Sequence, residues 1–290
     1  MKKYLICSRC PLPYILLAAL KVVVLTLVMM LPTTSAFADQ IANTDNRRAL
    51  LIGISQENEL IGLPYIPGID RDLARMKQWL ESQDYQVTTL MNPSRRLALQ
   101  KLEELAVISG VDEFVFYYSG HSADNGDKGY LVPVLSRQAS HAAKQAAGNG
   151  QSPFEEKQLT DELISSDVLH NFLRLSLASK QVVMIDGNTR RVCKPQLFAE
   201  NIQSLHFFCA GPGAVAKPDG GVFTSMILEG LKGQGDKGDD GRVDALELET
   251  WLKLSIPEAL GKKSTLMRNP AFFHFGENQA LSDLKRHSTE

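Results

Sequence analysis

Cysteine is scarce in this chain of 290 residues, which contains only four. Such a small number does not define a disulfide scaffold, and no spacing of His and Cys is typical of a zinc or iron site. Basic charge is not in excess either, with 31 Lys and Arg against 33 Asp and Glu, so no nucleic-acid partner is predicted. The remaining composition, 44% hydrophobic and 22% charged, is that of a globular protein with one large domain or two small ones.

Residues 1–38 have the pattern of a bacterial export signal. An apolar stretch at 22–31 precedes the small-x-small sequence Ala36-Phe37-Ala38. The segment contains no acidic residue, and its basic residues are Lys2, Lys3, Arg9 and Lys21. We expect cleavage after Ala38, a periplasmic or secreted protein, and a short linker at 39–46. Loss of the four basic residues would change the net charge from −2 to −6.

The alternative to cleavage is an uncleaved anchor from Tyr14 to Leu31. Lys21 would then lie near the centre of the bilayer, at a cost of about 2.5 to 3.5 kcal/mol, so cleavage is preferred. A membrane is a predicted partner only if this segment is retained.

Two apolar runs end in residues suited to a functional site. The run at 111–118 is rich in Val, Phe and Tyr, as expected for a strand buried on both faces, and it stops at Ser119, Gly120 and His121. A second run, at 180–186, ends in Asp186 and is followed by Gly187 and Asn188. Because open α/β sheets bind ligands at the carboxyl ends of their strands, these two ends are the predicted site.

The rest of the chain alternates predicted strands and helices, which indicates an α/β fold with a mostly parallel sheet. Further strands are expected at 48–55, 86–92, 129–134, 204–213 and 269–278, and an antiparallel direction is one option for the last of them. Helices are expected from Ile69, from Ser94 as N-cap, from Ser166 and within 220–233. Residues 135–160 are predicted to form an exposed insertion loop, with room for a short helix, and residues 279–290 a C-terminal tail.

The sequences FVFYYSGHS and VVMIDGNTRR resemble the caspase, metacaspase and gingipain group of cysteine peptidases. The similarity covers about residues 47–278 and implies a caspase-like three-layer sandwich, with helices on both faces of the sheet. In that group a Ser-Gly-His-Gly motif carries the catalytic histidine, and an Asp-x-Cys motif carries the nucleophile. The resemblance therefore implies that His121 is the retained base and that Asn188 stands in place of the nucleophilic cysteine.

The same resemblance implies an oxyanion region and a substrate pocket. Gly120, Ser122 and Gly187 would surround the oxyanion, with Ser122 in place of the glycine that the family has after its histidine. Asp186 and Asp72 would contact basic substrate side chains. For Asp72 the position in the first turn of a helix, where a carboxylate is favourable, is an equal alternative.

A carboxamide cannot act as a thiolate, so Asn188 predicts an inactive peptidase homologue. The expected function is binding of a peptide or protein ligand with basic residues, or regulation. The alternative is an active cysteine endopeptidase that prefers Arg or Lys and uses His121 with a relocated nucleophile, Cys193. Cys193 lies in a loop, however, and lacks the positioning that the end of a strand supplies. Whether the protein is an enzyme is left open.

The state of the two cysteines that follow the signal is also open. If the family topology holds, Cys193 follows one strand and Cys209 ends another, so they could form a disulfide or remain two buried thiols. Pairing of two chains into a homodimer through the last strand is a further open possibility.

Residues 236–247 partly match a calcium-binding loop. The candidate ligands are Asp236, Asp240, Asp244 and Glu247, but Gly238 at the third position offers no side-chain oxygen. The competing interpretation is a capping box, in which Asp244 caps a helix and Glu247 completes the box. No cofactor is therefore predicted, and calcium is a weak candidate.

Overall fold

The computed structural model describes residues 46–126, 128–193, 202–261 and 270–284. The predicted export signal and almost all of the linker lie outside these residues. Among the helices of the described segments, none combines the length and the apolar character that crossing a membrane requires.

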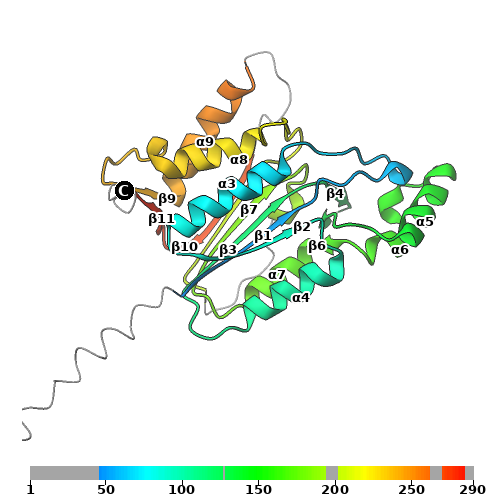
Figure 1. Cartoon of the computed structure of the whole chain (residues 1–290), viewed down its shortest axis with the longest axis horizontal. Coiled ribbons are helices and arrows are strands. Elements are labelled where there is room, and N and C mark those ends of the chain that lie inside the picture. The colour runs from blue at the N-terminus through cyan, green and yellow to red at the C-terminus, as the bar shows by residue number, and fades with distance from the viewer. Residues whose placement is uncertain (1–45, 127, 194–201, 262–269, 285–290) are drawn as a thin grey trace, which may run out of the picture. The chain divides into compact units, whose positions relative to one another are not determined.

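A six-stranded sheet lies between the helices (Figure 1), and its strand order is β10-β8-β7-β3-β1-β2. β10 is antiparallel to β8, and the other neighbours are parallel, as the sequence predicts for a mostly parallel sheet. The strands are β1 (Arg47–Gly53), β2 (Gln86–Met91), β3 (Glu113–Ser119), β7 (Lys180–Asp186), β8 (Ser204–Cys209) and β10 (Ala271–Gly276).

Helices cover both faces of this sheet (Figure 1). One face is covered by α3 (Ile69–Ser82), α8 (Val222–Glu229) and α9 (Ala245–Ala259), and the other by α4 (Arg95–Ala106) and α7 (Ser166–Leu175). Alternate residues of β3 enter the two cores: Tyr117 packs with the α3 side and Phe116 with the α4 side. This two-sided burial is the reason that the run at 111–118 is continuously apolar, and it confirms the three-layer α/β prediction.

The strand order reverses between β1 and β3, and this reversal positions the site. The chain runs from β1 to β2 on one side, and then returns to β3 on the other side of β1. The loops that leave β1 and β3 therefore separate at their carboxyl ends, where open α/β sheets form a ligand-binding crevice.

The segment 135–160 contains more helix than the exposed loop with one short helix that the sequence predicts. It forms α5 (Arg137–Gly148), the 3-10 turn η2 (Pro153–Glu155) and α6 (Lys157–Thr160). Ala139, Ala143 and Leu159 are buried in a small core of their own. The alanines recur at helical spacing, and Ser136 caps α5 by accepting from the Ala139 N–H. The amphipathic pattern of α5 is weak in the sequence, because its buried residues are mainly alanines and alanine contributes little to a hydrophobic signal.

The described residues also form two smaller sheets. β4 (Ser122–Asn125), β5 (Lys128–Leu131) and β6 (Ile164–Ser165) form one antiparallel sheet beside the insertion. β9 (Arg242–Asp244) and β11 (Ala280–Asp283) pair in the other. The prediction of a C-terminal tail at 279–290 is therefore wrong for residues 280–283, because they form β11, which pairs with β9 through main-chain hydrogen bonds.

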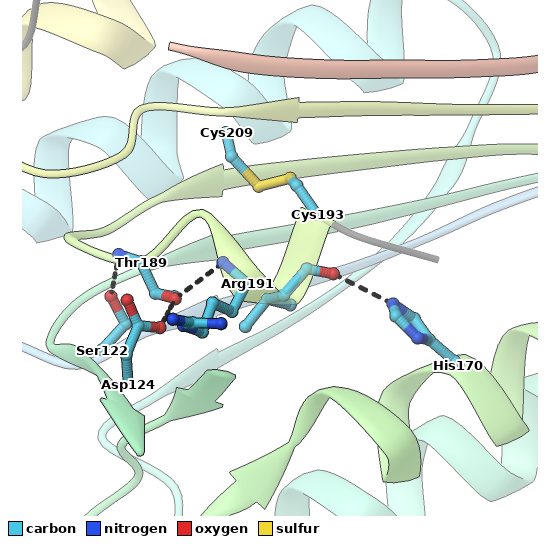
Figure 2. Close-up of a disulfide and its surroundings, with 8 residues drawn as sticks. Ser122, Asp124, His170, Thr189, Arg191, Cys193 and Cys209 are labelled. Atoms are coloured by element: carbon cyan, nitrogen blue, oxygen red, sulfur yellow. Dashed lines mark hydrogen bonds between the residues drawn. A yellow bond between two sulfur atoms is a disulfide. The ribbon is translucent and has the colours of Figure 1, made fainter. Parts of the chain in front are cut away.

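Cys193 and Cys209 form a disulfide, which resolves the choice that the sequence left open (Figure 2). Their Cα atoms are 6.3 Å apart, and both side chains are buried in the core on the α4 side of the sheet. The bond joins the short turn η3 (Arg191–Cys193), which follows β7, to the end of β8.

Removal of this disulfide is expected to lower the stability of the fold substantially. For the Cys193→Ala/Cys209→Ala variant we expect the free energy of unfolding to fall by about 3 kcal/mol, because the sequence separation of 16 closes a loop of moderate length. Urea unfolding of both proteins, with and without reductant, measures the effect. Reductant should destabilise only the wild type; equal stability of oxidised and reduced wild type would contradict the prediction.

Candidate functional site

A cavity of about 230 Å³ lies at the carboxyl ends of β1, β3 and β7. It is smaller than the roughly 300 to 1,000 Å³ of a typical small-molecule pocket and is suited to a single side chain. The residues that the sequence singles out and that line this cavity are Asp72, Gly120, His121, Asp186, Gly187 and Asn188. The fold thus gathers residues from three separate segments of the chain.

His121 is held in a defined orientation at the end of β3. Its Nε2 atom lies 2.7 Å from the carbonyl oxygen of Pro64, in the loop that follows β1. A carbonyl can only accept, so Nε2 carries the hydrogen, and Nδ1 of the neutral ring is left as an acceptor. The Tyr118 hydroxyl donates to the His121 carbonyl at 2.5 Å and fixes the backbone beneath the ring.

Burial lowers the pKa of His121 below its usual value, although the bond to Pro64 partly opposes this shift. Only 8% of the residue is exposed. The imidazole is therefore neutral at pH 7, the form that accepts a proton from an acidic group.

Asp72 and Asp186 form a buried acidic pair in the same cavity. Burial, strengthened by the charge of Asp186, raises the pKa of Asp72 to about 7. Burial also raises the pKa of Asp186 to about 6, although hydrogen bonds from Thr224 oppose the shift. Two desolvated carboxylates in one cavity favour either a bound proton or a cationic partner.

The start of α8 holds these two carboxylates in place. The Gly221 N–H donates to both oxygens of Asp72, at 3.0 and 2.8 Å, and the Thr224 hydroxyl donates to Asp186 at 2.8 Å. A Cβ atom on Gly221 would lie 2.3 Å from an oxygen of Asp186, and one on Gly220 would lie 2.4 Å from an oxygen of Asp72. The pair of glycines therefore lets the backbone approach both acids closely.

Asn188 and Ser122 have different environments. Asn188 is exposed at the rim of the cavity, between the buried residues Gly187 and Thr189. Ser122 does not line the cavity. Its hydroxyl accepts from the Thr189 N–H at 2.9 Å (Figure 2). The Thr189 hydroxyl in turn donates to Asp124. These contacts anchor the loop after β7 and so fix the place of Asn188.

Cys193 does not reach the cavity. Its sulfur is bonded to Cys209, only 4% of the residue is exposed, and it belongs to the core on the α4 side of the sheet. The structure therefore gives no support to Cys193 as a relocated nucleophile.

Sequence patterns do not identify several residues that form hydrogen bonds with the candidate site residues. The Pro64 carbonyl leaves no sequence signal, because every residue has a carbonyl group. Thr224 and Gly221 lie in a segment for which the sequence predicts only a helix. The adjacent glycines Gly220 and Gly221 were the one available signal, since consecutive glycines before a helix indicate close approach of the backbone to other groups.

The loop at 236–247 forms the capping box that was the competing interpretation. The Asp244 side chain accepts from the Glu247 N–H at 2.9 Å, and the Glu247 side chain accepts from the Asp244 N–H at 3.0 Å. Asp236 accepts from the Gly241 N–H at 3.0 Å. Within the described segments, no three Asp, Glu, His or Cys side chains gather as metal ligands would. Calcium binding stays a hypothesis from the sequence.

A family model described as "Caspase domain" matches residues 46–248, which is more than half of the chain. No curated protein matches the chain. The matched region contains β1, β3, β7 and β8 together with the residues that line the cavity. The family prediction is thus confirmed, although the predicted span continued to residue 278. The chain belongs to the caspase-domain family of cysteine peptidases.

Proposed function

We propose that this protein is an exported, catalytically inactive member of the family that binds peptides through an Arg or Lys side chain. The observation that carries the proposal is the pair of buried carboxylates, Asp72 and Asp186, in a cavity suited to a single side chain. A regulatory role would follow from such binding.

The residue at the strand end supports the lack of activity. A cysteine peptidase needs a thiolate close to the base, and Asn188 occupies the position two residues after Asp186 where the family motif has cysteine. An amide nitrogen has no accessible anionic form and cannot form an acyl-enzyme. His121 keeps the orientation of a base, but no cysteine is among the described residues that line the cavity.

The energetics of the acidic pair support a cationic ligand. An ionised carboxylate that is removed from water loses solvation, and it recovers part of that loss only from a partner. A guanidinium offers planar pairs of N–H donors that match carboxylate oxygens, and an ammonium offers a point charge. Either group would pair with Asp72 and Asp186 at the base of the cavity.

The disulfide supports export and argues against the alternative function. Disulfides persist mainly in oxidising compartments such as the periplasm. With Cys193 bonded to Cys209, an endopeptidase that uses Cys193 lacks a free thiol.

Calorimetry with short peptides tests the proposal. A peptide that contains arginine should bind at pH 8, and its citrulline analogue, which has the same shape without the charge, should bind about tenfold or more weakly. Asp186→Ala should weaken binding of the arginine peptide by about tenfold, because one charged partner is lost.

The matched control is Asp239→Asn, which removes an exposed carboxylate at a left-handed position (φ 52°) that asparagine also tolerates. This change should leave binding unaltered. Absence of binding by the folded wild type, or binding that is unchanged in Asp186→Ala, would contradict the proposal.

A further inference from the structure

The rim of the cavity carries hydrogen-bond donors. A basic side chain is itself a donor and needs acceptors, so these groups would not bind it. Asn188 is exposed there, and its side-chain amide offers two N–H donors. The main-chain N–H groups of His121, Gly187 and Asn188 make no hydrogen bond with any residue that the structure describes. All three residues line the cavity.

The charge at the rim differs from that at the base. At the base, Asp72 and Asp186 are 1% and 8% exposed and present acceptors. At the rim, Asn188 is uncharged, and the ring of His121, which also lines the cavity, is neutral, so neither repels an anion. A cysteine at residue 188 would become a thiolate in its active form and would repel a carboxylate. The asparagine therefore makes the rim compatible with a negatively charged group.

The spacing between the base and the rim of the cavity is limited by the chain. Asp186 and Asn188 are two residues apart in the chain, so their Cα atoms are at most about 7 Å apart. An extended Lys or Arg residue is long enough to span this distance. A single residue with a cation at one end and a carboxylate at the other would thus match acceptors at the base and donors at the rim.

We propose that the cavity binds the C-terminal Arg or Lys of a peptide, with the free α-carboxylate hydrogen bonded to the Asn188 amide and to the unpaired N–H groups at the rim. This inference rests on the proposed function and names its ligand class. Such peptides are products of hydrolysis on the carboxyl side of a basic residue, so another peptidase must supply them. The protein would then act as a receptor for cleaved peptides.

Matched peptides test this inference by calorimetry at pH 8. One peptide ends in arginine as a free acid, the second is identical but ends in an amide, and the third has the arginine at an internal position. The free acid should bind about tenfold or more tightly than the other two, because charge-assisted hydrogen bonds form only with the carboxylate.

Variants of Asn188 separate this contact from general electrostatic effects. Asn188→Asp should reverse the preference, so that the amide peptide binds more tightly than the acid, and Asn188→Ala should reduce the preference for the acid. Asn149→Asp, which adds the same charge at the exposed end of α5, should keep the wild-type preference.

The outcomes distinguish the two proposals. Equal affinity for the acid and amide peptides would overturn the carboxylate contact and leave the basic side-chain site intact. A preference for the acid that survives in Asn188→Asp would also overturn it. Failure of all three peptides to bind the folded protein would overturn the proposed function, and this inference with it.

Discussion

Asn188→Cys is expected to convert the protein into a peptidase that cleaves after Arg or Lys. Residue 188 and His121 line the same cavity, and the His121 ring is already oriented by Pro64 with Nδ1 as the acceptor. A thiol at residue 188 would supply the nucleophile that the cavity lacks; the imidazole would accept its proton, and the resulting thiolate could attack a bound carbonyl. Turnover of fluorogenic Arg and Lys peptides, absent in the wild type, measures the gain.

Further variants test whether the gained activity uses this site. His121→Ala in the Asn188→Cys background should lower the rate by about 10²- to 10⁴-fold, the usual contribution of a general base. Asn149→Cys provides an equal additional thiol at an exposed position and should stay inactive. Wild-type turnover, or turnover in Asn188→Cys that does not depend on His121, would contradict the assignment of this cavity.

Binding of a basic peptide is expected to depend strongly on pH. The pKa values of Asp72 and Asp186, raised to about 7 and about 6, mean that both carboxylates are ionised only at alkaline pH. If the ligand requires both charges, its affinity should fall by about 100-fold from pH 8 to pH 5.5. His121 contributes little over most of this range, because its lowered pKa keeps the ring neutral.

As pH rises, the free energy of unfolding of the protein without ligand should fall, whereas the affinity for a basic peptide should increase. A carboxyl group whose pKa is raised on folding contributes stability that is complete below its unfolded pKa, near 3.8, and is lost as pH rises through about 7. Without ligand, the protein should therefore become less stable between pH 4 and pH 7. Asp72→Asn should raise the free energy of unfolding by about 2 to 4 kcal/mol at pH 8 and change it little at pH 4.

Urea unfolding and calorimetry across this pH range measure both effects. Asp72→Asn should also flatten the pH dependence of peptide binding, because only Asp186 still titrates. Asp239→Asn, which removes an exposed carboxylate that does not line the cavity, should leave both profiles unchanged. A wild-type affinity that is constant between pH 5.5 and pH 8 would contradict the role of the acidic pair.

The sequence by itself determined the central strands and the place of the site. The apolar runs that end at Ser119 and Asp186 require burial on both faces, and a layered α/β fold with helices on both sides of the sheet provides it. His121 and Asn188 follow those runs directly, so their position at the carboxyl edge was predictable from local pattern alone. The N-caps at Ser94 and Asp244 were predictable for the same reason, since capping depends on neighbouring residues.

Only the tertiary structure decided the contacts between distant segments. The pairing of Cys193 with Cys209, the bond from His121 to the Pro64 carbonyl, and the position of Asp72 beside Asp186 all join segments that are far apart in sequence. Local periodicity contains no information about such pairings, because they depend on strand order and on how closely glycine lets two chain segments approach. The reversal between β1 and β3 is what unites these residues around one cavity.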